Sequence, residues 1–227
     1  MGNLLNIHGS VDVRNTTPST ALVVDDTTDP GAHPAVSLSD TALLGLAPAA
    51  ITYQKSGLGV VLGSGFEGLD VRSSNGADTI TVTNTPGFTS IGLGKGPHRL
   101  NVEGLTEALN IGPNVGFGAT GQTTVVVGSN PSGTGGTQAN IHGQLAFDDL
   151  GSGSGTSNVV VDDSGDATPR TVSLTASGIF SNNTGNITGL APGANVRFID
   201  VISSTNLIIN GAVAEIPSTS PTPSLGS

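Results

Sequence analysis

An internal duplication constrains this chain more than any other feature of its sequence. Four short blocks of residues occur twice, in the same order and at a nearly constant distance along the chain. The first copies are Asn6–Gly9, Ala21–Asp26, Val36–Ser39 and Gly45–Pro48, and the second copies are Asn140–Gly143, Asn158–Asp163, Val172–Thr175 and Gly189–Pro192. Repetition in the same order indicates one structural unit used twice, with the insertions confined to loops.

The local pattern of apolar residues predicts short β-strands from end to end. Apolar side chains recur at every second position, as in Val36/Leu38 and Val172/Leu174, and Gly, Asn, Asp or Pro flanks each pair. Alternation between turn-forming residues is typical of strands. Helix evidence is poor, because Gly45 and Pro48 interrupt the best candidate, residues 43–50. We therefore expect an all-β fold.

Two all-β architectures fit short strands at this spacing: a parallel β-helix or β-solenoid, and tandem β-sandwich repeats. Only 3% of the residues are aromatic and none is Trp, so stacked thin layers of aliphatic side chains are favoured over a broad core. Side-chain amides beside the strands can also stack from coil to coil, at Asn101, Asn110, Asn206 and Asn210. Against this, Asn75-Gly76 and Asn210-Gly211 are typical of hairpins. We expect the β-solenoid, with β-sandwich repeats as the alternative.

The duplication also predicts how the chain is divided. Residues 1–137 form the first β unit, and residues 138–216 form a second, shorter unit stacked on it. Residues 217–227 are rich in Pro, Ser and Thr and have no apolar period, which is typical of a linker or tail.

Charge and composition narrow the classes of partner. The net charge is −10, from 17 acidic and 7 basic residues, which argues against nucleic acid and anionic membranes because both require a basic surface. No apolar run is long enough to span a membrane. The chain has no Cys, so disulfides and thiolate sites are excluded. Because the repeats are cut at both ends, we interpret the chain as a piece of a longer secreted protein.

An acidic trio present in both copies is the strongest candidate site. It comprises Asp25, Asp26 and Asp29 in the first copy and Asp162, Asp163 and Asp166 in the second. Three carboxylates around one turn at a strand end offer hard oxygen ligands for Ca²⁺, and turn carbonyls and water can complete the shell. The alternative is structural, because Asp also ends strands and caps turns through its own side chain. We expect no required cofactor and treat Ca²⁺ as the candidate ion, one per copy.

Other candidate chemistry is weaker. His8 and His142 occupy equivalent positions, but His33 and His98 have no matched spacing to them, so a converging zinc site is not indicated. Nucleophile–base spacings and phosphate-binding loops are absent from the sequence, and we predict that the protein is not an enzyme. The alternative is a β-helix that binds or cleaves polysaccharides, with Asp162, Asp163 and Arg170 in its cleft.

The second copy resembles a known kind of repeat. Val160–Thr175, followed by Ile187–Pro192, resembles the degenerate V-D-D-S and I-x-G-L-x-P strand repeats of very large bacterial secreted and cell-surface proteins. The first copy matches more loosely through Val24–Ile51, and Gly76–Val82 looks like the Gly/Asp-Thr strand that alternates with those words. The resemblance implies a secreted repeat region, a β-solenoid fold and an adhesive or matrix role, with no catalytic residues to transfer.

These observations together predict a structural or interaction module of an extracellular or cell-surface bacterial protein, one that assembles into fibres or mediates adhesion. The expected partners are other copies of the chain, neighbouring repeats of a longer chain, or surface glycans. Nucleic-acid binding and membrane insertion are not expected. A calcium-stabilised scaffold is a further alternative.

Overall fold

The computed structural model describes residues 2–14, 21–54, 68–113, 121–148, 156–177, 183–191, 195–200 and 205–211. Within these ranges the chain is all-β, as predicted, with 17 strands and no helix. The strands are β1 (Val11–Val13), β2 (Leu22–Asp25), β3 (Val36–Leu38), β4 (Ala42–Leu44), β5 (Ile51–Tyr53), β6 (Leu69–Arg72), β7 (Thr79–Val82), β8 (Thr89–Leu93), β9 (His98–Val102), β10 (Leu109–Pro113), β11 (Thr123–Val127), β12 (Leu145–Asp148), β13 (Ser157–Asp162), β14 (Ser173–Ser177), β15 (Asn183–Thr188), β16 (Val196–Asp200) and β17 (Thr205–Asn210). The expected tail at 217–227 lies outside the described residues.

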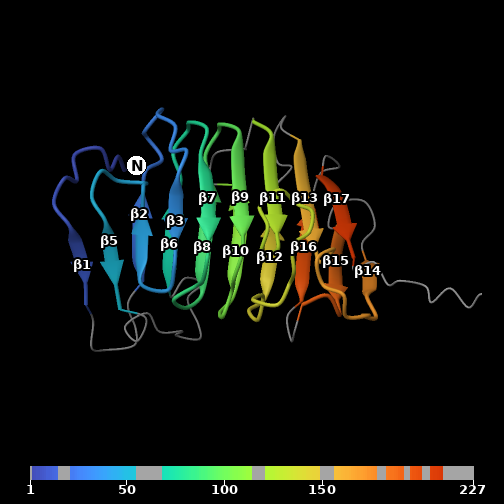
Figure 1. The fold of residues 1–227 in the computed structure, drawn as a ribbon. Helices are drawn as coiled ribbons and strands as arrows, with labels where there is room; N and C mark the ends of the chain where they lie inside the picture. The colour runs from blue at the N-terminus through green and yellow to red at the C-terminus, as the bar shows by residue number, and fades with distance from the viewer. Residues whose placement is uncertain are drawn as a thin grey trace, which may run out of the picture.

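The strands form two mixed, mostly parallel sheets that lie against each other (Figure 1). Sheet A has nine strands in the order β1-β5-β4-β3-β7-β9-β11-β13-β17, and sheet B has eight in the order β14-β15-β16-β12-β10-β8-β6-β2. From β6 to β13, each strand lies in the opposite sheet to the strand before it and pairs in parallel with the strand two positions earlier or later. This alternation is compatible with a β-helix or β-solenoid.

In-register pairing aligns the buried side chains into columns between the sheets. In sheet A, Ile80, Leu100 and Val125 are register partners of one another along β7, β9 and β11, and none has exposed surface. In sheet B, Val71 and Ile91 occupy the same kind of column. Burying each such side chain contributes about 1.5–3 kcal/mol to folding. The aliphatic core expected from the composition is confirmed in this part of the chain.

Two antiparallel meanders interrupt the parallel pattern, one in each copy of the duplicated sequence. β3, β4 and β5 form the first, and β5 then pairs in parallel with β1. β14, β15 and β16 form the second, and β16 then pairs in parallel with β12. The duplication is therefore structural as well as sequential. The copies differ in the sheet to which the meander belongs, because the first meander lies in sheet A and the second in sheet B.

The hairpin signal at Asn75-Gly76 does not make a hairpin. It connects β6 to β7, which lie in different sheets. The Asn75 side chain instead joins three successive turns, because its Nδ2 donates to the Thr27 carbonyl oxygen (2.7 Å) and its Oδ1 accepts from the Lys95 backbone N–H (3.1 Å). A side-chain amide that serves neighbouring turns explains the residue without antiparallel pairing.

Glycines stack where the chain crosses from sheet B to sheet A. A Cβ placed at Gly76 would lie 2.0 Å from the Gly31 carbonyl oxygen, one at Gly96 would lie 2.1 Å from the Gly76 oxygen, and one at Gly121 would lie 2.4 Å from the Gly96 carbonyl carbon. The neighbouring atoms are backbone and cannot move aside independently. The turns can therefore approach this closely only because these positions lack side chains.

We predict that Gly96→Ala destabilises the fold because its methyl group would overlap the Gly76 backbone. Overpacking of this kind costs about 1–3 kcal/mol, measured as the change in unfolding free energy in urea. Gly9→Ala is the matched control, since a Cβ at Gly9 has no atom within 4 Å. Equal stability of the two variants would contradict the close stacking of the turns.

Candidate functional site

The acidic trio forms the same turn in both copies, directly after β2 and directly after β13. The first Asp of each trio closes the turn onto the residue two positions later. Asp25 Oδ1 accepts from the backbone N–H (3.0 Å) and the hydroxyl (2.7 Å) of Thr27. Asp162 Oδ1 accepts from the N–H (3.2 Å) and the hydroxyl (2.6 Å) of Ser164. These carboxylates act on their own backbone, as turn-forming Asp residues do.

The second Asp of each trio is completely buried and attaches a preceding loop to the turn. Asp26 Oδ1 accepts from the Leu4 backbone N–H, and Asp163 Oδ1 accepts from the Gln138 backbone N–H, each at 2.9 Å. Leu4 and Gln138 both stand just before the repeated Asn-Ile-His-Gly block. Burial raises the pKa of Asp26 and of Asp163 above the ordinary value, because the charged form loses its hydration.

The third Asp of each trio completes the turn through its main chain and its side chain. The Asp29 N–H donates to the Asp26 carbonyl oxygen (3.0 Å), and the Asp166 N–H donates to the Asp163 carbonyl oxygen (3.1 Å). One carboxylate oxygen then accepts a backbone N–H two residues later, from Gly31 in the first copy (2.7 Å) and from Thr168 in the second (2.8 Å). The other oxygen points toward the second Asp.

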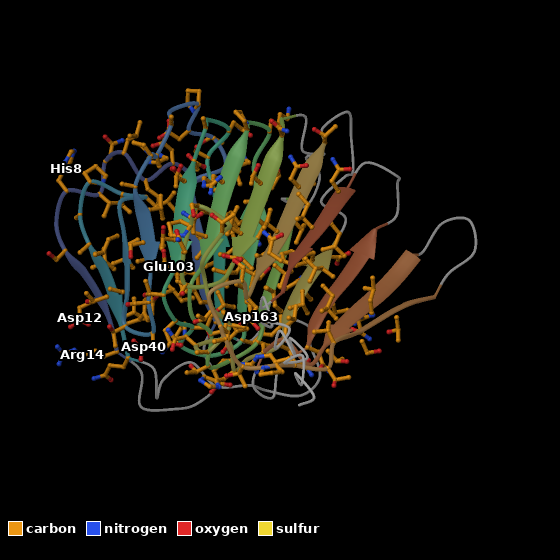
Figure 2. All side chains as sticks on the ribbon, turned by 45° about the vertical axis from the view of Figure 1, so that its right-hand side comes forward. His8, Asp12, Arg14, Asp40, Glu103 and Asp163 are labelled. Atoms are coloured by element: carbon orange, nitrogen blue, oxygen red, sulfur yellow. The ribbon has the colours of Figure 1, made fainter. Side chains whose placement is uncertain are left out.

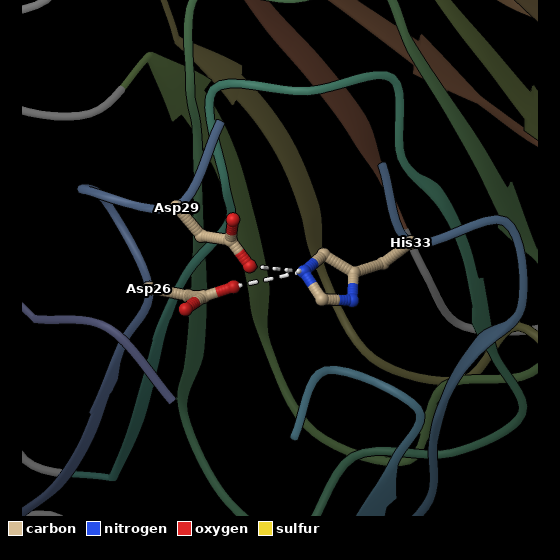
Figure 3. Close-up of side chains that lie close together, drawn as sticks. All are labelled: Asp26, Asp29 and His33. Atoms are coloured by element: carbon tan, nitrogen blue, oxygen red, sulfur yellow. Dashed lines mark hydrogen bonds and ion pairs between the residues drawn. The ribbon is translucent and has the colours of Figure 1, made fainter. Parts of the chain in front are cut away.

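A fourth residue, four positions after the third Asp, joins each trio. The sequence placed Arg170 with Asp162 and Asp163 only in the polysaccharide alternative, and it did not associate His33 with the first trio. In the second copy it is Arg170, whose Nε lies 3.2 Å from Asp163 Oδ2 and 3.1 Å from Asp166 Oδ2, while its Nη2 also contacts Asp166. In the first copy it is His33, whose Nε2 lies 3.0 Å from Asp26 Oδ2 and 3.3 Å from Asp29 Oδ2 (Figure 3). The two residues stand at the same spacing in the sequence, four positions after the third Asp, but they differ in residue type and were therefore not recognised as equivalent.

The structure therefore divides the six predicted ligands into two kinds. Among the described residues, the group whose ligand atoms converge for a metal ion is Asp26, Asp29 and His33, with those atoms within 4.8 Å of one another. Asp25 and Asp162 bond to the turn instead. Asp163 and Asp166 converge as well, but on the guanidinium of Arg170. His8 and His142, the repeated histidines, are both exposed.

A second buried cluster, of Ser74, Asp78 and His98, lies next to the first-copy turn. The Ser74 hydroxyl donates to Asp78 Oδ1 (2.8 Å), which also accepts the His33 backbone N–H (2.9 Å), and Asp78 Oδ2 lies 3.5 Å from His98 Nδ1. Burial lowers the pKa of His98. The Ser74 hydroxyl and the His98 imidazole thus both contact the Asp78 carboxylate, which also holds the backbone of His33.

An open polar pocket of about 240 Å³ lies near the turn between β9 and β10. It is lined by Thr83, Asn84, Gly104, Leu105, Thr106, Asn140 and His142. Its hydroxyl and amide groups are unconnected with the acidic turns.

Comparisons with known proteins assign the chain to no family. No protein-family model matches it, and no curated protein or solved structure does so either. In the described part of the chain no helix is long and apolar enough to cross a membrane. The chain is therefore an all-β protein of two mostly parallel sheets in which the same acidic turn occurs twice.

We predict that Arg170→Ala is strongly destabilising, because it leaves the buried Asp163 carboxylate without its cation. Because water reaches the Arg170 side chain, which is 24% exposed, the loss is smaller than for a fully buried pair, about 1–3 kcal/mol, measured by chemical unfolding. Arg14→Ala is the control, since Arg14 and its partner Asp12 lie at the margin of the structure (Figure 2), with 71% and 44% of their side chains exposed. That exposed pair contributes about 0–1 kcal/mol. Equal losses in the two variants would show that Arg170 acts as an ordinary surface residue.

We also predict an acid-dependent loss of stability that Asp166 causes. The Arg170 side chain, followed by the Thr168 hydrogen bonds, lowers the pKa of Asp166 from 3.8 to about 2. The stabilisation from this group is complete above the unfolded value of 3.8 and is lost as the pH falls toward 2, because the folded state resists protonation. Unfolding free energies measured at several pH values below 4 will therefore fall less steeply in Asp166→Asn than in the parent chain. An unchanged slope would contradict this assignment.

Proposed function

We propose that the chain is a segment of a β-solenoid and that its role is structural, as an interaction module of an extracellular or cell-surface bacterial protein. The β-solenoid is supported by the alternation of consecutive strands between the sheets and by their in-register parallel pairing. The antiparallel sheets of a β-sandwich would pair consecutive strands instead. The secreted, cell-surface setting rests on the resemblance of the repeated words to those of large bacterial surface proteins.

The role of the repeated words supports a scaffold rather than an enzyme. In both copies the Asp residues hold a turn, attach a loop to it and face a nitrogen-bearing side chain, His33 in the first copy and Arg170 in the second. Asp162 and Asp163, which the polysaccharide alternative places in a cleft, have no exposed surface. A substrate could reach them only if the turn opened. We therefore propose a non-enzymatic module.

The proposed interaction is supported by a difference between β3 and its counterpart β14: the two strands differ in their pairing and in the exposure of their apolar residues. In the first copy, β3 pairs with β7, and Val36 and Leu38 are only 1% and 0% exposed. In the second copy, the equivalent β14 stands at the end of sheet B, and Val172 and Leu174 are 40% and 55% exposed. Among the described residues, no strand covers that side of β14.

An edge strand with exposed apolar side chains is a template for pairing with another chain. The first copy supplies the pattern of the missing partner, because β7 (Thr79–Val82) pairs with β3 in parallel and its Ile80 and Val82 lie beside Val36 and Leu38. We propose that a β7-like strand from a second copy, or from the next repeat of a longer chain, pairs with β14. Main-chain hydrogen bonds and burial of Leu174 would hold this contact, and repetition of it would produce fibres.

We predict that the protein associates as its concentration rises and that Leu174→Lys prevents this, because a lysine at an edge strand opposes pairing. Light scattering after size-exclusion chromatography measures the mass, and electron microscopy shows whether rods lengthen. Leu44→Lys is the control, since Leu44 is 44% exposed but lies on β4, between two paired strands. The proposal fails if the parent chain stays monomeric at every concentration, or if Leu174→Lys associates as readily as Leu44→Lys.

A further inference from the structure

The two acidic turns share the hydrogen bonds of their three Asp residues described above, but they differ in the group that supplies positive charge. The pairs Asp25/Asp162, Asp26/Asp163 and Asp29/Asp166 make matching hydrogen bonds, as described above. At the fourth position, Arg170 brings a permanent charge to Asp163 and Asp166, whereas His33 brings an imidazole to Asp26 and Asp29. The second copy thus shows what this arrangement of buried carboxylates requires: a cation between the second and third Asp.

The hydrogen bonding of His33 defines which ring nitrogen faces the carboxylates. His33 Nδ1 lies 3.2 Å from the Gly45 carbonyl oxygen, which can only accept a hydrogen bond, so Nδ1 carries a proton. In neutral imidazole, Nε2 then presents its lone pair to Asp26 Oδ2 and Asp29 Oδ2. Three electron-rich atoms that face one another require a proton or a metal ion among them. A carbonyl that fixes the tautomer of a histidine in this way is also the usual second shell of a metal ligand.

A buried oxygen without a hydrogen-bond donor points into the same space. Asp26 is completely buried, and its Oδ2 has no hydrogen-bond partner among the described residues. His33 Nε2 lies 3.0 Å from this oxygen. Leaving a buried charged acceptor unpaired is costly, so the site is built for a positively charged occupant.

Ligand type and spacing distinguish between candidate ions. Ca²⁺ takes six to eight oxygen ligands and seldom imidazole, whereas Zn²⁺ takes four ligands, readily combining imidazole with carboxylates. Bonds of about 2.0–2.1 Å in a tetrahedral site place ligand atoms about 3.3 Å apart. The distances of 3.0 and 3.3 Å from Nε2 to the two carboxylate oxygens match this spacing. The His33 side chain keeps 13% of its surface exposed, which leaves room for water as the fourth ligand.

We propose that Asp26 Oδ2, Asp29 Oδ2 and His33 Nε2 form a zinc site in the first copy, in the position that the Arg170 guanidinium occupies in the second. The ion replaces the built-in cation of the second copy and links the turn after β2 to the loop that Asp26 holds through Leu4. The site is structural, since three protein ligands bury the ion and the role of the equivalent Arg170 is to hold the turn. This assignment does not depend on the proposed self-association.

The duplication supplies its own matched variants for the test. Tag-free protein, first treated with chelator, is titrated with Zn²⁺ and separately with Ca²⁺, with binding followed by calorimetry and the melting temperature recorded for each. We expect one equivalent of Zn²⁺ to bind and to raise the melting temperature, because an ion bound only by the folded state stabilises it. We expect His33→Arg, which copies the second site, to fold, to lose the response to Zn²⁺ by at least tenfold in affinity, and to melt independently of chelator. Arg170→His, which copies the first site, should gain a second equivalent.

Each outcome bears on the assignment. The absence of Zn²⁺ binding by the parent chain overturns it and leaves a proton as the occupant. Binding that survives in both His33→Arg and His33→Gln places the ion elsewhere, at exposed residues such as His8 or His142. If Ca²⁺ raises the melting temperature at least as much as Zn²⁺ does, and still does so in His33→Gln, the assignment is wrong and the site is a calcium site formed by carboxylates alone. His33→Gln also replaces His33→Arg if the latter does not fold, and X-ray absorption at the zinc edge then checks for a nitrogen ligand in the parent chain.

Discussion

In-register parallel pairing is the constraint on which the rest of this structure depends. When each strand lies directly beside its equivalent, every buried side chain contacts the one before it and the one after it in the same column. All members of a column must then have similar size. Val, Leu and Ile meet this condition, as in the column of Ile80, Leu100 and Val125. The same repetition brings turn upon turn, which explains why glycines stack at Gly76 and Gly96 and why Asn75 bonds to the turns on both sides of it.

The acidic turns resolve a problem that this stacking creates. A loop that lies outside the paired strands, such as the one containing Leu4 or Gln138, has backbone N–H groups that the sheets cannot satisfy. A buried carboxylate accepts them, but its negative charge then loses hydration. In the second copy Arg170 offsets that charge, and in the first copy His33 occupies the equivalent position, four residues after the third Asp. The turn is thus a unit of four residues, of which the repeated acidic pattern in the sequence showed the three Asp residues.

Much of the fold could be predicted from the sequence because period-two alternation and repeated words report local geometry directly. The strands, the aliphatic core and the duplication all follow from such patterns. The meanders could not be predicted in this way, because antiparallel pairing of β3, β4 and β5 depends on which strands lie next to one another in space. The hairpin signal at Asn75-Gly76 misleads for a related reason: the same two residues suit a turn that crosses between sheets. In the site, Asp26 and Asp29 were predicted but His33 was not. Its counterpart in the second copy is Arg170, a different residue type, so the two residues are recognised as equivalent only from their positions in the structure.

The placement of the two copies in different sheets has a consequence for any longer array of this unit. The acidic turn of the first copy leads from sheet B into sheet A, and that of the second leads from sheet A into sheet B. From one acidic turn to the next, the chain therefore crosses between the two sheets an odd number of times. An acidic turn with the same direction of crossing recurs only after two copies of the unit. In an array continued by this rule, successive acidic turns lie on opposite sides of the molecule. Any ligand of these turns is then displayed alternately on the two sides.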